Sequence, residues 1–333
     1  MLTTTVQGRT WNFSHAIGWN AIAGNGFTQP FSVTFAGSDI IYVLNRGGEN
    51  VPNRRIGKWT SVPNVDEEFI RDFGREDFTW PVALAVSSKR HVYCTDEHEN
   101  RVIKWDSEGE KLGEWGNSGG AEGELYKPSG IAFDSEDNLY VVDAGNHRVQ
   151  KFTSEGSFLL SWGSLGSGEG EFRDPWGITV DRSGSVYIAD WGNNRVQKFT
   201  EVGDYIQSFG VAYPDELKLN HPSDVAVDSD GDVYIVDWGN KRVQICDNQG
   251  EILTCLYGDA VEFSKSAKDF LQANPDFQKA FNRAQDTTSL GLFERPVGIA
   301  IDENDRIIIS ETVRCRLQVY VKEKNFMDPQ YNL

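Results

Sequence analysis

The sequence KPSGIAFDSEDNLYVVDAGNHRVQKF, residues 127–152, is one copy of a unit that recurs along the 333-residue chain. The copy opens with a proline and a short apolar run, turns through acidic residues, and continues into a second apolar run that ends in an acid. A Gly-Asn corner and a third run that begins with arginine complete it. Short runs rich in β-branched and aromatic residues, separated by Asp, Asn, Gly and Ser, are typical of strands joined by tight turns.

Six copies can be aligned on the proline that opens each of them. The intervals between successive prolines are 51, 47, 47, 47 and 74 residues. A repeat near this length, with three or four short strands in each copy, is typical of the blades of a β-propeller. We therefore predict an all-β fold, a six-bladed β-propeller that occupies residues 1–333 as a single domain. The opening prolines are Pro30, Pro81, Pro128, Pro175, Pro222 and Pro296.

The strands of one blade can be placed within the third copy, and the N-terminal segment resembles a strand that the sixth copy lacks. The sixth copy ends near Tyr320 without a fourth strand, whereas Trp11–Gly18 is followed by the same glycines and proline as the fourth strand of the second copy. We predict that this segment completes the sixth blade and closes the ring without an exposed sheet edge. The strands expected in the third copy are 130–133, 139–142, 148–152 and 158–162.

The longest interval between opening prolines contains an insertion at residues 259–292. Its apolar residues, among them Phe263, Ala267 and Phe270, have helical spacing, and the pattern is interrupted at Asn274–Pro275. We therefore predict two short amphipathic helices between blades five and six. Because the insertion leads into a blade-opening proline, we expect it to cover the central mouth of the propeller as a lid.

The corner motifs resemble those of the NHL-repeat family of six-bladed β-propellers, and the resemblance extends from about Trp11 to Tyr320. Blade one departs from the pattern with Asn45 in place of the acid, and blade six has Glu311 there without the Gly-Asn corner. The resemblance implies the propeller fold. Since propellers of this family include lyases, RNA-binding modules and protein scaffolds, it does not select a function. The matching motifs are DAGNHRVQKF (143–152), DWGNNRVQKF (190–199) and DWGNKRVQI (237–245).

Amidating lyases of this family hold zinc with histidines just after blade-opening prolines, and this chain has no histidine at those positions. We therefore expect no metal and no other cofactor. A carboxylate–histidine site through Asp174, His221 and Asp224 is the alternative. The residues that follow the prolines are Phe31, Val82, Ser129, Trp176, Ser223 and Val297.

The net charge, the apolar runs and the cysteines of the chain indicate which partners and which cellular compartment to expect. A net charge of -18 repels phosphate backbones, so we expect no nucleic-acid partner and no binding to anionic membranes. No apolar run reaches the length of a membrane-spanning helix, and no secretory signal is apparent, so we expect a cytoplasmic protein. The four cysteines are expected to be free thiols: the turn near Cys246 would place it opposite Ile252 and not opposite Cys255.

An acid closes the second strand and an arginine opens the third strand in nearly every copy. Because one active site does not need five or six copies of the same pair, we predict a structural role, with bidentate hydrogen bonds between acid and arginine. The acids are Asp96, Asp143, Asp190, Asp237 and Glu311, and the arginines are Arg55, Arg101, Arg148, Arg195, Arg242 and Arg316.

The candidate site lies where residues differ from copy to copy around the central axis. The residues before four consecutive opening prolines are Lys127, Asp174, His221 and Arg295. If the site is catalytic, His221 is the expected base or acid and Asp174 its partner, while Lys127 and Arg295 bind developing negative charge. The structural alternative is a solvated funnel with a charged rim.

The other candidate ligand-binding residues lie beside the opening prolines or in the Gly-Asn corners. We expect Trp80 and Trp176 to form walls of the site, and Trp191 and Trp238 to form an aromatic platform for a ligand or partner. The remaining candidates are Gln29, Ser129, Ser223 and Asp224.

Two functions follow from this pattern. The first is a pocket for a small-molecule ligand or substrate at the central mouth, with metal-independent acid–base chemistry of the lyase, hydrolase or isomerase class. The second is a non-catalytic scaffold that binds a protein partner through the tryptophan-rich face.

Overall fold

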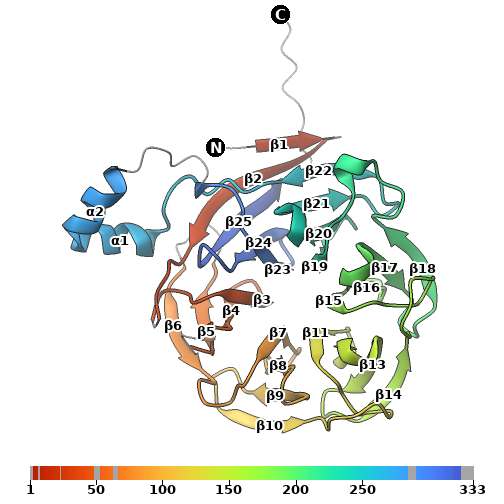
Figure 1. Ribbon diagram of the computed structural model, residues 1–333. Coiled ribbons are helices and arrows are strands. Elements are labelled where there is room, and N and C mark those ends of the chain that lie inside the picture. The colour runs from red at the N-terminus through yellow and green to blue at the C-terminus, as the bar shows by residue number, and fades with distance from the viewer. Residues whose placement is uncertain are drawn as a thin grey trace, which may run out of the picture.

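Six antiparallel β-sheets stand around a central axis, as the blades of a propeller do (Figure 1). The all-β, six-bladed fold predicted from the repeat is confirmed, and each innermost strand of a blade begins at its opening proline. This computed structural model describes residues 3–6, 8–22, 24–48, 53–62, 67–283 and 290–323.

The strands of blades one to five follow one another along the chain from the axis outward. Blade one contains β3 (Pro30–Ala36), β4 (Ile40–Asn45), β5 (Arg55–Thr60) and β6 (Phe69–Phe73). Blade two contains β7 (Pro81–Val86), β8 (Val92–Asp96), β9 (Arg101–Trp105) and β10 (Lys111–Trp115). Blade three contains β11 (Pro128–Phe133), β12 (Asn138–Asp143), β13 (Arg148–Thr153) and β14 (Phe158–Trp162). Blade four contains β15 (Pro175–Val180), β16 (Val186–Asp190), β17 (Arg195–Phe199) and β18 (Tyr205–Phe209). Blade five contains β19 (Pro222–Val227), β20 (Val233–Asp237), β21 (Arg242–Cys246) and β22 (Ile252–Leu256).

Blade six is built from the two ends of the described chain. Its inner strands are β23 (Pro296–Ile301), β24 (Arg306–Glu311) and β25 (Arg316–Glu323). Strand β2 (Arg9–Ile17) pairs antiparallel with β25, which confirms the predicted closure of the ring by the N-terminal segment. Strand β1 (Thr3–Val6) then adds a fifth strand outside β2. The repeat did not predict β1, because no other copy has a counterpart.

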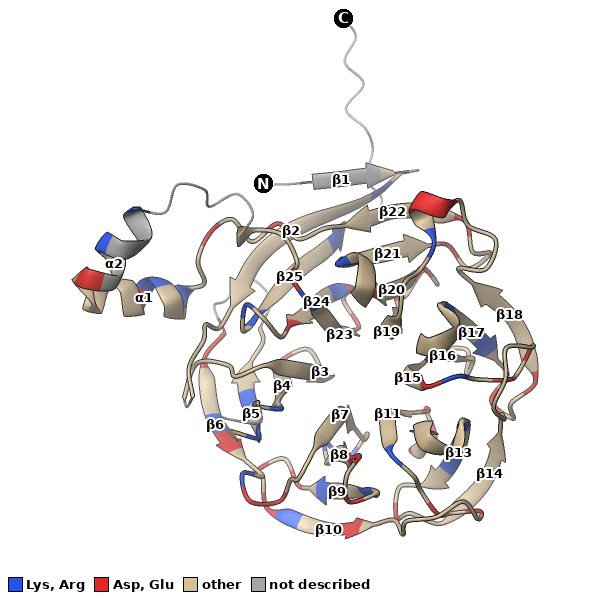
Figure 2. Cartoon of the chain, in the orientation of Figure 1, with Lys and Arg blue, Asp and Glu red and all other residues tan. Residues whose placement is uncertain are grey.

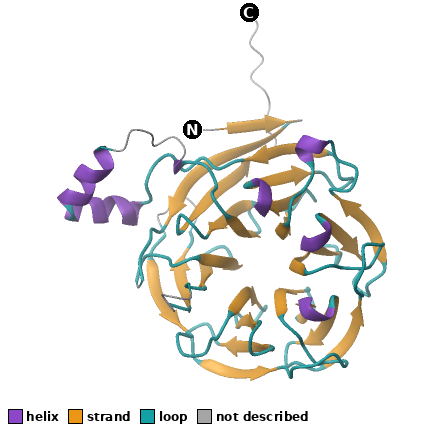
Figure 3. Ribbon diagram, in the orientation of Figure 1, coloured by secondary structure: helices purple, strands orange, loops and turns teal. Residues whose placement is uncertain are grey.

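Three Gly-Asn corners fold as short 3-10 helices between the second and third strands of their blades (Figure 3). Each corner ends in a residue with left-handed backbone, such as Asn194 with φ of 55°. These corners lie at the end of the blade where the opening prolines lie. The short helices are η1 (Ala144–Asn146), η2 (Trp191–Asn193) and η4 (Trp238–Asn240), and η3 (Asp215–Leu217) precedes β19.

The core lies between neighbouring blades. All five residues of β20 are buried, because the second strand of a blade is covered by other blades on both of its faces. Tyrosines at the same repeat position in five blades are almost inaccessible to solvent, and they fill the space between sheets. These are Tyr42, Tyr93, Tyr140, Tyr187 and Tyr234.

In blades two to six, a buried carboxylate at the end of the second strand joins separate segments of the chain. In blade three, Asp143 accepts the N–H of Tyr126 at 2.6 Å and the Nε–H of Arg148 at 2.8 Å. The other guanidinium nitrogens of Arg148 donate to backbone carbonyls of residues 120–124. The prediction of a bidentate pair is therefore wrong. Only Nε of the arginine donates to the acid, and the other two nitrogens donate to the loop that leads into the opening proline.

The same arrangement recurs in three further blades. The arginine Nε lies 2.8 Å from Asp190, 2.7 Å from Asp237 and 2.6 Å from Glu311. Each of these acids also accepts the backbone N–H of the residue two positions before the opening proline of its own blade. The repeated acid thus has the structural role that its repetition predicted.

Blades one and two vary this arrangement without losing the contact to the loop. In blade one, Asn45 accepts the N–H of Thr28 at 2.9 Å through its side-chain oxygen. In blade two, Asp96 accepts the backbone N–H groups of residues 79 and 80, while Arg101 forms its ion pair with Glu114 instead.

The four cysteines are free, as expected. Cys246 lies opposite Ile252 in the sheet, so the hairpin holds it out of register with Cys255. Burial raises the pKa of the Cys94 thiol and of the other three thiols.

The insertion forms the two predicted helices, α1 (Lys265–Ala273) and α2 (Pro275–Asn282). The hydroxyl of Ser264 accepts the N–H of Ala267 at 3.2 Å, which caps α1, and donates to the carbonyl of Gly18 at the end of β2. Among the described residues, no helix is long and apolar enough to cross a membrane.

The helices lie beside the ring, next to β2, and not over its centre (Figures 1 and 3). Phe270 of α1 stacks on Trp19, with the ring centroids 4.3 Å apart, and this contact holds the helix against the outside of blade six. The expected lid is therefore wrong for the described part of the insertion. Residues 284–289, which belong to the same segment, lie outside the described residues.

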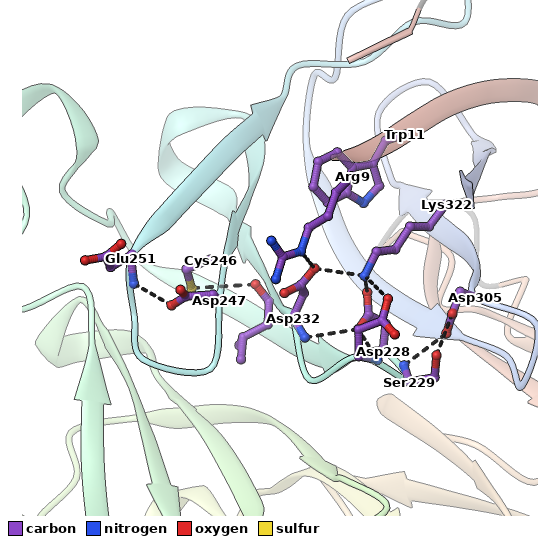
Figure 4. Close-up of polar contacts among 12 residues, drawn as sticks. Arg9, Trp11, Asp228, Ser229, Asp232, Cys246, Asp247, Glu251, Asp305 and Lys322 are labelled. Atoms are coloured by element: carbon purple, nitrogen blue, oxygen red, sulfur yellow. Dashed lines mark hydrogen bonds and ion pairs between the residues drawn. The ribbon is translucent and has the colours of Figure 1, made fainter. Parts of the chain in front are cut away.

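A buried ion cluster joins both ends of the described chain to blade five (Figure 4). Lys322, at the end of β25, is 4% exposed, and its Nζ lies 2.6 Å from Asp228 and 2.8 Å from Asp232. Its third carboxylate partner is Asp230, at 2.8 Å. Arg9 at the start of β2 places its Nε 2.8 Å from Asp232. One turn, between β19 and β20, therefore holds both of the strands that close the ring.

We expect Asp190→Ala to lower the free energy of unfolding by about 3–5 kcal/mol, because it leaves the buried guanidinium of Arg195 without its counter-charge. It also removes the acceptor for the N–H of Arg173. The control is Asp204→Ala in an exposed turn, for which we expect a change within about 0.5 kcal/mol. Urea unfolding of both variants tests this, and equal losses would contradict the structural role of the acid.

We expect Lys322→Met to lower the free energy of unfolding by about 3–5 kcal/mol at neutral pH, because it leaves Asp228 and Asp232 buried together without an ammonium group. The loss should shrink as the pH falls, since carboxylates that repel each other in the folded state regain stability when they bind protons. Arg9→Gln should cost less, because the Arg9 side chain is 30% exposed. Thermal melts across pH test this order, and an Arg9 variant as unstable as the Lys322 variant would refute it.

Candidate functional site

The residues before the opening prolines are held by the corner of the preceding blade. The N–H of Lys127 donates to the side-chain oxygen of Asn100 at 2.7 Å, and the N–H of His221 donates to that of Asn194 at 2.7 Å. Lys127 and His221 have φ of 51° and 55°, in the left-handed region. The backbone therefore fixes where these side chains leave the sheet. The N–H of Asp174 makes the corresponding contact with Nδ1 of His147 at 3.4 Å, which gives that histidine a structural role.

The six innermost strands line a central channel of about 430 Å³. These strands are almost free of charge, whereas charged residues are frequent on the outer strands and turns (Figure 2). Asp224 is the one charged residue on the innermost strands β3, β7, β11, β15, β19 and β23.

Two aromatic side chains close the channel at the end where the opening prolines lie. Phe31 follows the opening proline of blade one, and Trp176 follows that of blade four, which stands on the opposite side of the ring (Figure 1). Their ring centroids are 6.1 Å apart. The two rings therefore meet across the axis and form a floor between the channel and the space outside it.

A cavity of about 970 Å³ lies above this floor, and we call it the mouth cavity. Its described lining comes from blades four, five, six and one and from the loop before β3, so it is displaced from the axis. No Asp, Glu or His is among the described residues that line it. The aromatic lining residues are Phe31, Trp176, Trp191 and Trp238, and the basic ones are Arg46 and Arg295.

The tryptophans form a continuous aromatic wall on one side of the mouth cavity. The ring of Trp191 lies 6.3 Å from that of Trp176 and 6.5 Å from that of Trp238, measured between centroids. All three are partly buried. Trp191 and Trp238 hold these positions because they begin the 3-10 corners of blades four and five.

The structure brings half of the sequence-predicted site residues together at the mouth cavity. Trp80 lies nearby, with its ring 4.5 Å from the Cζ of Arg46, but it does not line the cavity. Lys127 and Asp174 are exposed on the rim and also do not line it. The predicted residues that line the mouth cavity are Gln29, Trp176, Trp191, Ser223, Trp238 and Arg295.

Ser129 and Ser223 bond to neighbouring blades through their hydroxyl groups, and His221 lies behind the aromatic wall. The hydroxyl of Ser129 donates to the carbonyl of Trp176 at 2.9 Å, which ties blade three to blade four. The hydroxyl of Ser223 similarly reaches a carbonyl of blade six. The ring of His221 packs 4.0 Å from that of Trp191, and its Nδ1 lies 2.6 Å from the side-chain oxygen of Asn220. His221 therefore supports the aromatic wall and is not among the cavity-lining residues.

Arg46 lines the mouth cavity, although it was not among the predicted site residues. Its guanidinium lies between the rings of Phe31 and Trp80, with Cζ 4.4 Å and 4.5 Å from the two centroids. A signal was present in the repeat. Arg46 follows Asn45 just as Trp191 and Trp238 follow the acids of their blades, so the same corner position supplies all three.

Asp224 lies in the channel wall near the floor. Its two oxygens accept the N–H of Val225 and the N–H of Ile299 in the next blade, each at 3.0 Å. Gly177 in blade four makes room for it, because a Cβ there would lie 2.4 Å from Oδ1 of Asp224. Burial raises the pKa of Asp224 to about 7, although the two N–H donors act in the opposite direction.

We expect Asp224→Asn to gain stability relative to the natural protein as the pH rises from about 4 to about 7. The raised pKa means that the protonated carboxyl stabilises the folded state at low pH, and that this contribution is lost as the pH rises through about 7. The asparagine is neutral throughout and loses nothing. Melting temperatures across pH test this, with Asp174→Asn at the exposed rim as the control for loss of a charge. A constant difference between Asp224→Asn and the natural protein would contradict the assignment.

Comparison with known proteins identifies the repeat. The family model described as NHL repeat matches residues 125–152, 172–199 and 219–246, which lie in blades three, four and five. A search of curated proteins finds no match.

Solved structures with the same architecture are similar along most of the chain. A protein of unknown function from Bacteroides thetaiotaomicron is 19% identical, with a TM-score of 0.63, over 95% of this chain and 76% of that one. An inactive variant of virginiamycin B lyase from Staphylococcus aureus, solved with quinupristin, is 13% identical, with a TM-score of 0.58, over 94% and 99%. A chain of a nidogen–laminin complex is 17% identical, with a TM-score of 0.54, over 76% and 92%.

At these identities the solved structures share the fold with this chain, and their ligands and partners do not transfer with it. The repeat matches and the arrangement of the six sheets agree on the architecture. This chain is a six-bladed β-propeller that contains NHL repeats.

Proposed function

We propose that this propeller binds a small molecule in the mouth cavity. One observation carries the proposal: Phe31 and Trp176 meet across the axis, so that the cavity above them has a floor. A concave site with aromatic walls and a few polar groups is the usual form of a small-molecule site. The cavity volume of about 970 Å³ lies within the range of roughly 300–1,000 Å³ that such sites occupy.

Metal-independent acid–base catalysis of the lyase, hydrolase or isomerase class receives less support than binding. His221 packs behind Trp191, and Asp224 lies in the channel wall below the floor. A ligand in the mouth cavity would meet aromatic rings and arginines before either of these groups. For turnover, Trp191 or the floor would have to move so that one of them could reach the ligand.

The second candidate function is a scaffold that binds a protein partner through its tryptophans. Trp191 and Trp238 would then have to act as exposed anchors on an open face. Both are instead partly buried, line the mouth cavity and pack against other rings. The inward position of these side chains favours a small ligand.

We expect at least one compound of a metabolite panel to raise the melting temperature of the natural protein. A ligand at about 100 times its dissociation constant adds roughly 2.7 kcal/mol to the free energy of unfolding. Trp191→Ala should abolish the ligand-induced shift, because it removes the middle of the aromatic wall. Trp19→Ala should retain it, since Trp19 packs on α1 outside the ring.

Each shift is measured against the melting temperature of the same variant without ligand, so that a loss of stability is not mistaken for a loss of binding. The proposal is wrong if no compound stabilises the natural protein, or if Trp191→Ala and Trp19→Ala respond alike. An assay for turnover of any compound that binds then tests the catalytic form of the function.

A further inference from the structure

The mouth cavity differs in charge from the protein around it. The chain carries a net charge of -18, yet the described residues that line the cavity include two arginines and no acid. The arginines and the tryptophans also lie on different blades. Arg46 and Arg295 come from the adjacent blades one and six, whereas Trp176, Trp191 and Trp238 come from blades four and five. The cavity therefore has a cationic side and an aromatic side.

Arg46 is built into the cationic side as a rigid group. It is 7% exposed, and the rings of Phe31 and Trp80 hold its guanidinium plane from two directions. One of its outer nitrogens lies 3.2 Å from Glu97, while its Nε is buried without a hydrogen-bond partner among the described residues. As a rigid, charged residue of the cavity lining, Arg46 favours a ligand that carries a hydrogen-bond acceptor.

Arg295 provides the second positive charge from a more exposed position. Its Cζ lies 5.5 Å from the ring centroid of Trp238, so the guanidinium marks the boundary between the cationic and aromatic sides. It forms no ion pair with a carboxylate in the described ranges of the chain. Arg54 lies 5.4 Å from the ring centroid of Trp80 and adds a third guanidinium near the same side.

The two arginines and the absence of an acid among the described lining residues disfavour a cationic ligand. An aromatic cage for a cation pairs its rings with carboxylates or with no other charge, whereas arginines would repel the ligand. A neutral apolar ligand would offer no acceptor to the two arginines that line the cavity. A flat ring bearing a negative charge satisfies both sides, because the ring stacks on the tryptophans and the anion accepts hydrogen bonds from the arginines.

We propose that the mouth cavity selects a small anion that carries a flat ring system, with the ring against Trp176, Trp191 and Trp238 and the anionic group toward Arg46 and Arg295. This inference rests on the proposed function, since it specifies the ligand of the same cavity. It assigns recognition of the anion to two residues from blades that lie next to each other in the ring. The same chemistry suits a carboxylate and a phosphate.

Matched pairs of ring compounds test the proposal on the full chain. Naphthoate and indole carboxylate are compared with their neutral carboxamides by calorimetric titration, so that only the charge changes within a pair. We expect each carboxylate to bind at least about 10-fold more tightly than its amide, as expected for charge-assisted hydrogen bonds. Phenyl phosphate and inorganic phosphate extend the series, and inorganic phosphate should bind weakly because it has no ring.

Arginine variants assign the selectivity to the cationic side. Arg295→Gln should weaken binding of the carboxylates about 10-fold and leave the amides unchanged. It is the main variant because the Arg295 side chain is exposed, so the fold does not depend on it. Arg46→Gln should have the same selective effect. Arg173→Gln is the matched control: this arginine is exposed on the same rim of blade four but does not line the mouth cavity.

The proposal is overturned if amides bind as tightly as carboxylates, if Arg295→Gln and Arg173→Gln have equal effects, or if none of the ring anions binds. Its failure is distinct from a failure of the proposed function. A neutral metabolite whose binding depends on Trp191 would support a small-molecule site and refute anion selection. A panel in which no compound binds would refute both.

Discussion

A buried acid at the end of the second strand in blades two to six is the constraint on which the rest of this structure depends. It accepts the backbone N–H two positions before the blade-opening proline, and in most blades it also binds the first arginine of the third strand. The arginine in turn holds carbonyls of the same loop. One charged group therefore holds the sheet, the corner and the loop together. The residues around the mouth cavity belong to these corners and loops, so the same group fixes where they lie. Where blade one replaces the acid with Asn45, the contact to the loop is kept, and Arg55 forms its ion pair with Asp72 instead.

The repeat was sufficient to predict the blades but not the geometry between opposite blades. Strand boundaries, the closure by residues 11–18 and the pairing of Cys246 with Ile252 all follow from local spacing, and the structure agrees with them. The meeting of Phe31 with Trp176 could not be predicted in this way. The position of a residue in the repeat predicts where it lies within its own blade. The contact between Phe31 and Trp176 depends instead on the width of the ring of blades and on the length of the two side chains that reach across it.

The candidate site was predicted in its location and only partly in its members. Reasoning from the opening prolines identified Trp176 and Arg295, but it gave equal weight to Lys127 and Asp174, which are exposed on the rim. Arg46 lines the cavity but was not among the predicted site residues. The residue ranges of the two helices were predicted correctly, but their position relative to the ring was not. That position depends on the stacking of Phe270 on Trp19, and the spacing of apolar residues along the sequence does not predict such a tertiary contact.

The ion cluster at Lys322 also bears on how the ring resists mechanical force. In the pairing of β2 with β25, Thr10 lies opposite Glu323 and Trp11 lies opposite Lys322, so the outer ends of the two strands are neighbours. After β1 has detached, a force that pulls these ends apart would break the residue pairs between β2 and β25 one after another. It would not load all of the pairs at the same time, as shear does. Arg9 and Lys322 anchor the first of those pairs to blade five. The end of the strand pair at which this opening would begin is therefore tied to blade five.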